Sequence, residues 1–138
     1  MTESKGKCGC GAIEYSFSGG PFGSAFCYCK SCQVRTGSDK YFGLWVKPAN
    51  FKITKGTPTS FAEFGDSGKE VILHFCGVCS TNLYLDVTVG NFISVVASTL
   101  NDTEGLVPQM AIYTASAPTW ALFPENVPKF DILPPAKK

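Results

Sequence analysis

The chain has 138 residues, and its 12 basic and 11 acidic side chains give a formal net charge of +1. This length is typical of one domain, and a hydrophobic content of 44% excludes a disordered chain. The near-neutral charge gives no broad basic surface for nucleic acid or an anionic membrane. The start of the sequence is polar, and its most apolar runs, such as Val71–Cys76, are about six residues long, against about 20 for a membrane span. We therefore expect a soluble, cytoplasmic protein without a membrane partner.

The predicted elements are mainly short strands, because aromatic and β-branched residues alternate with polar ones between turns rich in glycine and proline. In chain order they are Lys5–Cys10, Ala12–Phe17, Ser24–Cys27, Tyr41–Lys47, Phe51–Lys55, Ser60–Phe64, Glu70–Phe75, Asn82–Asp86, Phe92–Ala97 and Met110–Tyr113. One short helix is expected over Lys30–Thr36, ended by Gly37. Many short strands at this spacing predict an all-β fold, either a sandwich or a barrel.

The cysteines form the clearest motif of the sequence. All seven fall into three clusters, Cys8-x-Cys10, Cys27-x-Cys29-x-x-Cys32 and Cys76-x-x-Cys79. An odd number cannot be paired fully in disulfides, and disulfides are rare in a reducing compartment. A CxxC turn places two sulfurs close together, and a CxC in a strand places both on one face. Since tetrahedral zinc needs such convergence, the clusters indicate metal binding.

Seven sulfur ligands suit one closed site of four and one open site of three, and an open coordination position is typical of catalytic zinc. One partition joins Cys8 and Cys10 with Cys76 and Cys79, so that one short loop supplies Cys27, Cys29 and Cys32. The other joins Cys29 and Cys32 with Cys76 and Cys79, which leaves Cys8, Cys10 and Cys27. The first is preferred because one loop then forms the open site. A single structural zinc with spare thiols, or a redox or metal-buffer protein, remains as an alternative.

The spacing of these clusters resembles that of the glutathione-dependent formaldehyde-activating enzymes, a domain also present in centromere protein V. The resemblance extends over about residues 5–131. It rests on motifs that are spread along the chain: Gly6-x-Cys8-x-Cys10-Gly11, Cys27-x-Cys29-x-x-Cys32, Thr36-Gly37, Phe75-Cys76-x-x-Cys79, Leu83, Trp120 and Pro124 to Pro128. It implies one domain over residues 1–138, a β-tent fold and two zinc ions per chain, and it supports the first partition.

The resemblance also implies a zinc-dependent carbon–sulfur lyase that acts on glutathione or a glutathione adduct. Its reaction would be formation or cleavage of S-hydroxymethylglutathione, the adduct of glutathione with formaldehyde, as in detoxification. Two departures from the family pattern are Tyr28, where many members have histidine, and Ala111-Ile112, where many have His-Ile. A lyase for another glutathione conjugate, in a biosynthetic or detoxification pathway, is therefore an alternative. A zinc-stapled binding module, by analogy with centromere protein V, is a further one, although Lys137-Lys138 is the only basic tail.

Candidate partners of the open site lie close to its cysteines in the sequence. Arg35, the only arginine, offers a planar fork for a glutathione carboxylate, and Lys30 and Lys40 would add positive potential. Tyr28 is a candidate catalytic residue beside Cys27, Cys29 and Cys32, as a hydrogen-bond donor to an alkoxide. The single histidine, His74, is interpreted either as a partner of the Cys76 site or as a core histidine with its hydrogen bonds satisfied.

Overall fold

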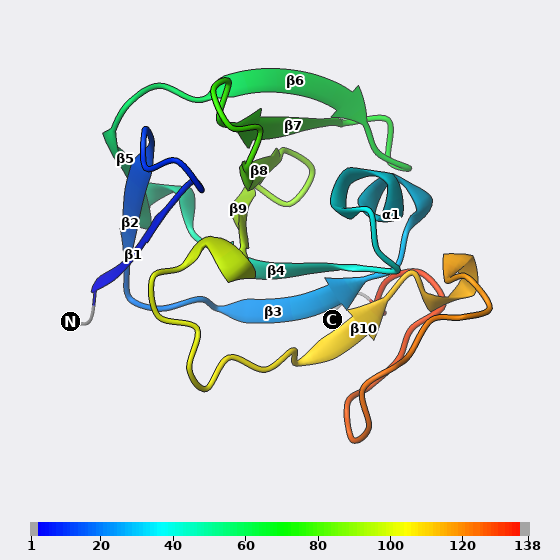
Figure 1. Ribbon diagram of the computed structural model, residues 1–138. Helices are drawn as coiled ribbons and strands as arrows, with labels where there is room; N and C mark the ends of the chain where they lie inside the picture. The colour runs from blue at the N-terminus through cyan, green and yellow to red at the C-terminus, as the bar shows by residue number, and fades with distance from the viewer. Residues whose placement is uncertain (1–2, 136–138) are drawn as a thin grey trace. The chain divides into compact units, whose positions relative to one another are not determined.

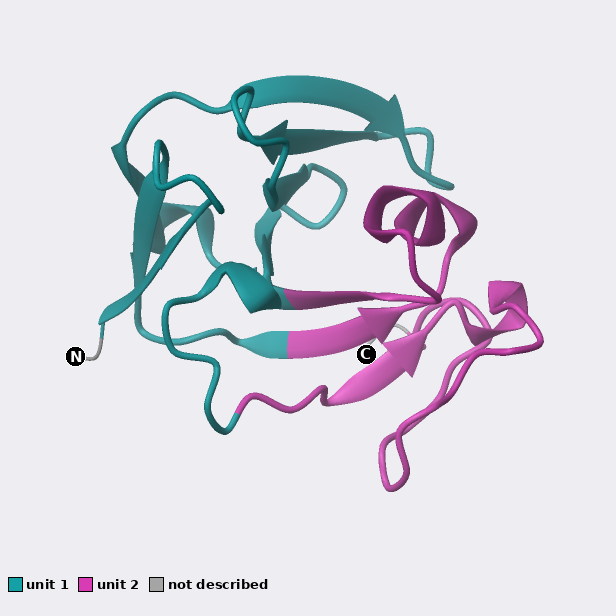
Figure 2. Ribbon diagram, viewed as in Figure 1, with its two compact units in different colours: residues 1–23, 44–105 teal, residues 24–43, 106–138 magenta. Residues whose placement is uncertain are grey.

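The computed structural model describes residues 3–135, so that Lys137 and Lys138 lie outside the described residues. The chain divides into two compact units: unit 1 contains residues 1–23 and 44–105, and unit 2 contains residues 24–43 and 106–138 (Figure 2). Over the described residues the structure is mostly β, which confirms the prediction of an all-β fold. None of the helices within residues 3–135 has the length and apolar character needed to cross a membrane. The single domain over residues 1–138 stays a prediction.

Unit 1 contains a three-stranded sheet and an antiparallel run of longer strands (Figure 1). The three-stranded sheet has the order β1-β2-β5, with β1 at Glu3–Lys7, β2 at Glu14–Ser18 and β5 at Phe51–Lys55. The run has the order β9-β8-β7-β6, with β6 at Thr59–Phe64, β7 at Glu70–Phe75, β8 at Asn82–Val87 and β9 at Phe92–Val96. Two single turns of 3₁₀ helix, η1 (Pro48–Asn50) and η2 (Ala97–Thr99), precede β5 and follow β9.

The register of the three-stranded sheet separates an apolar face from a polar one. On the apolar face, Tyr15 and Phe17 of β2 are each only 1% exposed, and Tyr15 stacks on Phe51 of β5 with ring centroids 5.4 Å apart. On the polar face, Ser16 lies opposite Lys5 of β1 and opposite Lys52 of β5. Alternation along β2 therefore gives the sheet one core face and one polar face.

Unit 2 is built on a parallel strand pair and a short helix. Strand β3 (Gly23–Cys27) pairs with β10 (Met110–Ile112), and Ile112 lies opposite Cys27. The predicted helix is confirmed as α1 (Lys30–Thr36), and Gly37 ends it in the left-handed conformation with φ 68°, which glycine adopts without a Cβ penalty. The 3₁₀ turn η3 (Thr114–Ser116) follows β10, and β4 (Tyr41–Val46) carries the chain from unit 2 into unit 1.

The predicted strand over Lys5–Cys10 is wrong at its end. Strand β1 stops at Lys7, and the next residues form a tight turn in which the Gly11 N–H donates to the Cys8 carbonyl at 3.1 Å. Gly11 has φ 78°, so the chain reverses there instead of continuing the strand. Cys8 and Cys10 consequently converge through a turn, and the face-sharing argument from strand alternation does not apply to them.

Replacement of Gly6 by alanine tests the packing beneath β1. A Cβ on Gly6 would overlap the Tyr15 hydroxyl group and lie 2.6 Å from the Thr99 carbonyl oxygen. We expect G6A to lower the free energy of unfolding by about 1–3 kcal/mol, the usual cost of overpacking, as measured by chemical denaturation. The matched control is G65A, whose Cβ would make an ordinary 3.6 Å contact with Val71. Equal stabilities of the two variants would contradict this packing.

Candidate metal centres

Four of the seven cysteines gather at one end of β1 and β7 in unit 1. The sulfur atoms of Cys8, Cys10, Cys76 and Cys79 all lie within 4.8 Å of one another. Cys8 and Cys76 are each 1% exposed, whereas Cys10 is exposed and Cys79 is half-buried. None of the four forms a disulfide bond. The grouping is the one that the first partition predicts, and the role of these residues as metal ligands stays a prediction.

Two similar turns bring these sulfurs together. After Cys8, the Gly11 N–H donates to the Cys8 carbonyl at 3.1 Å, and after Cys76, the Ser80 N–H donates to the Cys76 carbonyl at 2.8 Å. Gly11 and Ser80 have positive φ angles of 78° and 67°, which close the turns. Main-chain N–H groups then point at the sulfurs: the Ile13 N–H donates to Cys8 Sγ at 3.3 Å, and the Cys79 N–H donates to Cys76 Sγ at 3.4 Å. Such donors stabilise thiolates.

The sulfur spacing of the four-cysteine group suits a tetrahedral metal ion. A Zn–S bond of about 2.3 Å corresponds to a tetrahedral edge of about 3.8 Å between sulfurs. The Cys8 and Cys10 sulfurs are 3.7 Å apart, and those of Cys10 and Cys76 are 3.8 Å apart. A hydrogen bond with the Thr81 hydroxyl group, 3.1 Å from the sulfur, lowers the pKa of Cys79 to about 5. The group is therefore compatible with zinc in both donor type and spacing.

The other three cysteines form a separate cluster within unit 2. Cys27 ends β3, Cys29 caps the N-terminus of α1, and Cys32 lies in the first turn of that helix. Their sulfurs lie within 4.8 Å of one another, and all three residues are half-buried. The Cys29 and Cys32 sulfurs are 3.1 Å apart, about 0.7 Å closer than the tetrahedral edge, so a metal ion would move them slightly apart.

In the three-cysteine cluster, hydrogen bonds between the sulfurs shift the three pKa values in different directions. Hydrogen bonds with Cys27 and then Cys32 lower the pKa of Cys29 to about 3. The hydrogen bond with Cys29 in turn raises the pKa of Cys27 to about 12, and hydrogen bonds with Cys27 and Cys29 raise the pKa of Cys32. A divalent cation would supply the positive charge that allows all three to ionise. Three soft donors therefore fit zinc and leave its fourth position for another ligand.

Tyr28 fixes the loop that carries these cysteines. Its side chain is fully buried, and its hydroxyl group donates to the Leu122 carbonyl at 2.9 Å. Its ring packs on Phe123 at a centroid distance of 4.8 Å, and its N–H donates to the Ile112 carbonyl at 3.0 Å. Gln33 of α1 adds a bond from Nε2 to the Tyr28 carbonyl at 2.8 Å. The sequence predicts Tyr28 as a catalytic residue whose hydroxyl group faces the open site. In the structure this hydroxyl group donates to a main-chain carbonyl instead.

The predicted cationic partners lie in different settings. Lys30 and Arg35 are exposed on α1, the helix that carries Cys32, and Arg35 follows Cys32 at the spacing that places side chains on one helix face. Lys40 is bound closely: its Nζ donates to both carboxylate oxygens of Asp39 at 2.9 Å and lies 5.3 Å from the Phe26 ring centroid. Lys30 and Arg35 therefore lie on the same helix as Cys32. Lys40 instead binds Asp39 and packs near the Phe26 ring.

Asp39 is a residue of this unit that no sequence motif singles out. It is 6% exposed, and besides Lys40 it accepts hydrogen bonds from the Ser38 hydroxyl group at 3.0 Å and the Leu122 N–H at 3.3 Å. Burial opposes ionisation, but the bonds from Lys40, Ser38 and Leu122 outweigh it and hold the pKa of Asp39 below its ordinary value. Asp39 therefore holds Leu122, whose carbonyl receives the Tyr28 hydroxyl.

His74 lies on β7 with both ring nitrogens occupied. Its Nε2 is 2.6 Å from an Asp86 carboxylate oxygen, and its Nδ1 is 3.0 Å from the Ser60 hydroxyl oxygen. The ring stacks on Tyr84 at a centroid distance of 4.3 Å. These contacts agree with the interpretation of His74 as a histidine whose hydrogen bonds are satisfied. The candidate metal ligands of both clusters are all cysteine sulfurs.

Fold and clusters together define a mostly-β protein with two cysteine groups, one of four sulfurs and one of three, that could hold metal ions. The family model described as glutathione-dependent formaldehyde-activating enzyme matches residues 3–116. The chain belongs to this family, and the resemblance drawn from the cysteine spacing is confirmed.

Comparison with solved structures supports the fold. The chain is similar to the crystal structure of a Rhodobacter sphaeroides protein, with a TM-score of 0.56 and 22% sequence identity. The match covers 75% of this chain and 91% of that one. At this identity the likeness concerns the fold alone. A search of curated proteins gave no significant match.

Replacement of Asp39 by asparagine tests the contact with Leu122. Because the pKa of Asp39 is lowered in the folded protein, its carboxylate stabilises the fold above the ordinary Asp pKa of about 3.9 and loses this effect as the pH falls through the folded value. We expect D39N to be less stable than the native protein at neutral pH, with a difference that shrinks toward acid pH. Urea denaturation across that range measures it, and a difference independent of pH would contradict the assignment.

Proposed function

We propose that this protein is a zinc-dependent carbon–sulfur lyase that acts on glutathione or a glutathione adduct. In the forward direction the glutathione S–H adds to formaldehyde: a sulfur–carbon bond forms and the proton goes to the carbonyl oxygen, giving S-hydroxymethylglutathione. The reverse reaction breaks that bond and returns the proton to sulfur. Family membership supports this chemistry, and detoxification in the cytoplasm is the proposed setting.

The observation that carries the proposal is the difference between the two cysteine groups. Cys8, Cys10, Cys76 and Cys79 supply four sulfurs, enough to fill a tetrahedral ion, whereas Cys27, Cys29 and Cys32 supply three half-buried ones. Three protein ligands and one open position are typical of a zinc ion that meets a substrate. When bound there, zinc would supply a soft Lewis acid that keeps a substrate thiol deprotonated and nucleophilic.

The remaining roles belong to side chains of unit 2. We assign Tyr28 as a positioning residue, because its hydroxyl group is bound to Leu122 and its backbone to Ile112 and Gln33. Lys30 and Arg35 would bind the carboxylates of glutathione, and Arg35 can do so with two parallel hydrogen bonds. These groups orient the tripeptide so that its sulfur, rather than a carboxylate, reaches the three cysteines.

Single cysteine replacements test whether the three-cysteine group is catalytic and the four-cysteine group structural. We expect the native protein to contain two zinc ions per chain, C32S to lose one of them together with turnover, and its fold to persist. C76S should lose the other ion and much of the stability, because structural zinc contributes on the order of 10 kcal/mol to folding. Metal analysis, circular dichroism and an assay with glutathione and formaldehyde provide the measurements.

The outcomes separate the competing functions. Unfolding of C32S, or turnover without the second ion, would contradict the assignment of an open catalytic site. Two zinc ions with no glutathione binding at millimolar concentration would remove glutathione as the substrate. Cleavage of another glutathione conjugate, without reaction of formaldehyde, would keep the lyase and change its substrate.

Arg35 and Lys30 are tested through substrate binding. We expect R35K to raise KM for glutathione about 5- to 10-fold with little change in kcat, since lysine keeps the charge but loses the planar fork. K30Q should raise KM by a smaller factor. The control is K69Q, which removes a lysine exposed in unit 1. Unchanged KM values in R35K and K30Q would show that neither residue binds the carboxylates.

A further inference from the structure

The polar face of the three-stranded sheet in unit 1 carries a row of facing side chains. Lys5 of β1, Ser16 of β2 and Lys52 of β5 lie opposite one another in register, and opposed residues in a sheet point to the same face. Two positions further along β2, Ser18 lies opposite Glu3. The central strand thus presents two hydroxyl groups between charged side chains of the strands on either side.

The Ser16 hydroxyl group is buried and lacks a partner. Ser16 is 2% exposed, and its Oγ forms no hydrogen bond with any residue from 3 to 135. The comparable buried serine, Ser24, donates to the Val107 carbonyl at 3.0 Å and accepts from the Gln109 N–H at 3.1 Å. Because a buried hydroxyl group without a hydrogen bond is costly, Ser16 needs a partner that the described residues do not supply.

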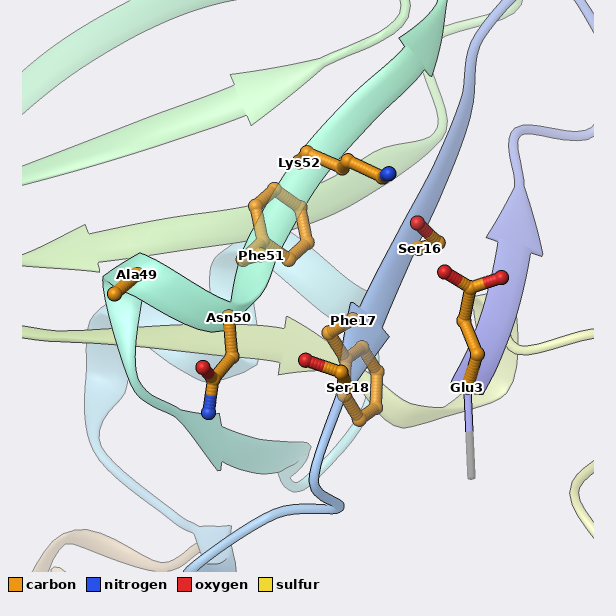
Figure 3. Close-up of a pocket in the computed structure, with 8 residues that line it drawn as sticks. All are labelled: Glu3, Ser16, Phe17, Ser18, Ala49, Asn50, Phe51 and Lys52. Atoms are coloured by element: carbon orange, nitrogen blue, oxygen red, sulfur yellow. The ribbon is translucent and has the colours of Figure 1, made fainter. Parts of the chain in front are cut away.

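Ser16 is one of the residues that line a small cavity of about 180 Å³. Figure 3 shows Ser16 on the central strand, with the Lys52 ammonium group on one side and the Glu3 carboxylate on the other. Ser18 and Asn50 add a second hydroxyl group and an amide to the lining. The volume is below the range of about 300–1,000 Å³ that is common for drug-sized ligands, so it suits a molecule of a few heavy atoms.

Neither Glu3 nor Lys52 has a strong partner among the described residues. Glu3 meets Lys5 at 3.9 Å, with both side chains well exposed, and such an ion pair is weak. The Lys52 ammonium group forms no hydrogen bond or ion pair with the residues that the structure describes. A lone anion would lie near the Glu3 carboxylate, and a lone cation would lie near Lys52. A molecule that carries both charges can place its anionic group near Lys52 and its cationic group near Glu3, so neither contact is repulsive.

We propose that this cavity binds a small zwitterion of the α-amino-acid type. Its carboxylate accepts hydrogen bonds from the Ser16 hydroxyl and the Lys52 ammonium group, and its ammonium group donates to the Glu3 carboxylate. Ser18 and Asn50 complete the polar lining. The site lies within unit 1 and is independent of the proposed lyase activity, because none of its residues belongs to either cysteine group.

Titration of the zinc-loaded protein with glycine, followed by ¹H–¹⁵N NMR at constant ionic strength, tests the site. We expect saturable shifts of the Ser16 and Lys52 amides with a dissociation constant in the millimolar range, as suits so few ligand atoms. Acetate and methylammonium, each carrying one of the two charges, should bind at least about tenfold more weakly. Equal binding of acetate would overturn the zwitterion, and the absence of saturable shifts would show that water alone satisfies Ser16.

Variants identify the groups that bind glycine. S16A, K52Q and E3Q should each weaken glycine binding about tenfold, the usual effect of losing one hydrogen bond to a charged group. The matched control is K7Q, which removes a lysine of β1 that does not line the cavity. Dispersed spectra of all four variants confirm folding, and unchanged glycine affinity in S16A and K52Q would overturn the proposal.

Discussion

The convergence of four sulfurs in unit 1 is the constraint on which the rest of that unit depends. It joins residues that are far apart in the sequence, since Cys10 and Cys76 are separated by 66 positions. A metal bound to all four sulfurs would act as a cross-link over a long loop, which restricts the unfolded chain far more than a local contact does. The turns after Cys8 and Cys76 bring the sulfurs and their N–H donors together, so a metal bound there would stabilise the fold that forms its site.

The three-cysteine group has the opposite character. Cys27, Cys29 and Cys32 lie within six consecutive residues, so a metal bound there closes only a short local loop. The long-range contacts of this loop are made by other groups, above all by Tyr28 with Leu122, 94 positions away. Tyr28 therefore stabilises the loop, whereas the three cysteines are the candidate metal ligands. A site whose ligands do not hold the fold together can leave one coordination position for a substrate.

The sequence predicts the elements whose bounds depend on residues that are neighbours in the chain. Helix α1 follows from a helix-forming run ended by Gly37, and β5 and β7 have the predicted bounds, because alternation and turn residues are local signals. The end of β1 was mispredicted, because the reversal at Gly11 outweighs strand propensity through a turn that also aims Cys8. The grouping of the sulfurs followed from spacing and family resemblance together. Asp39 could not be found, because its bond to Leu122 spans 83 positions and neither residue carries a motif.

The use of sulfur alone bears on the chemistry that the three-cysteine group can support. The one histidine of the chain is bound to Ser60 and Asp86, and neither cysteine group includes a nitrogen ligand. Three thiolates around a divalent cation leave a net charge of −1, which weakens the cation as a generator of hydroxide from water. A neutral set of three imidazoles would favour hydroxide instead. The composition of the group therefore supports the proposed thiol substrate rather than a hydrolytic reaction.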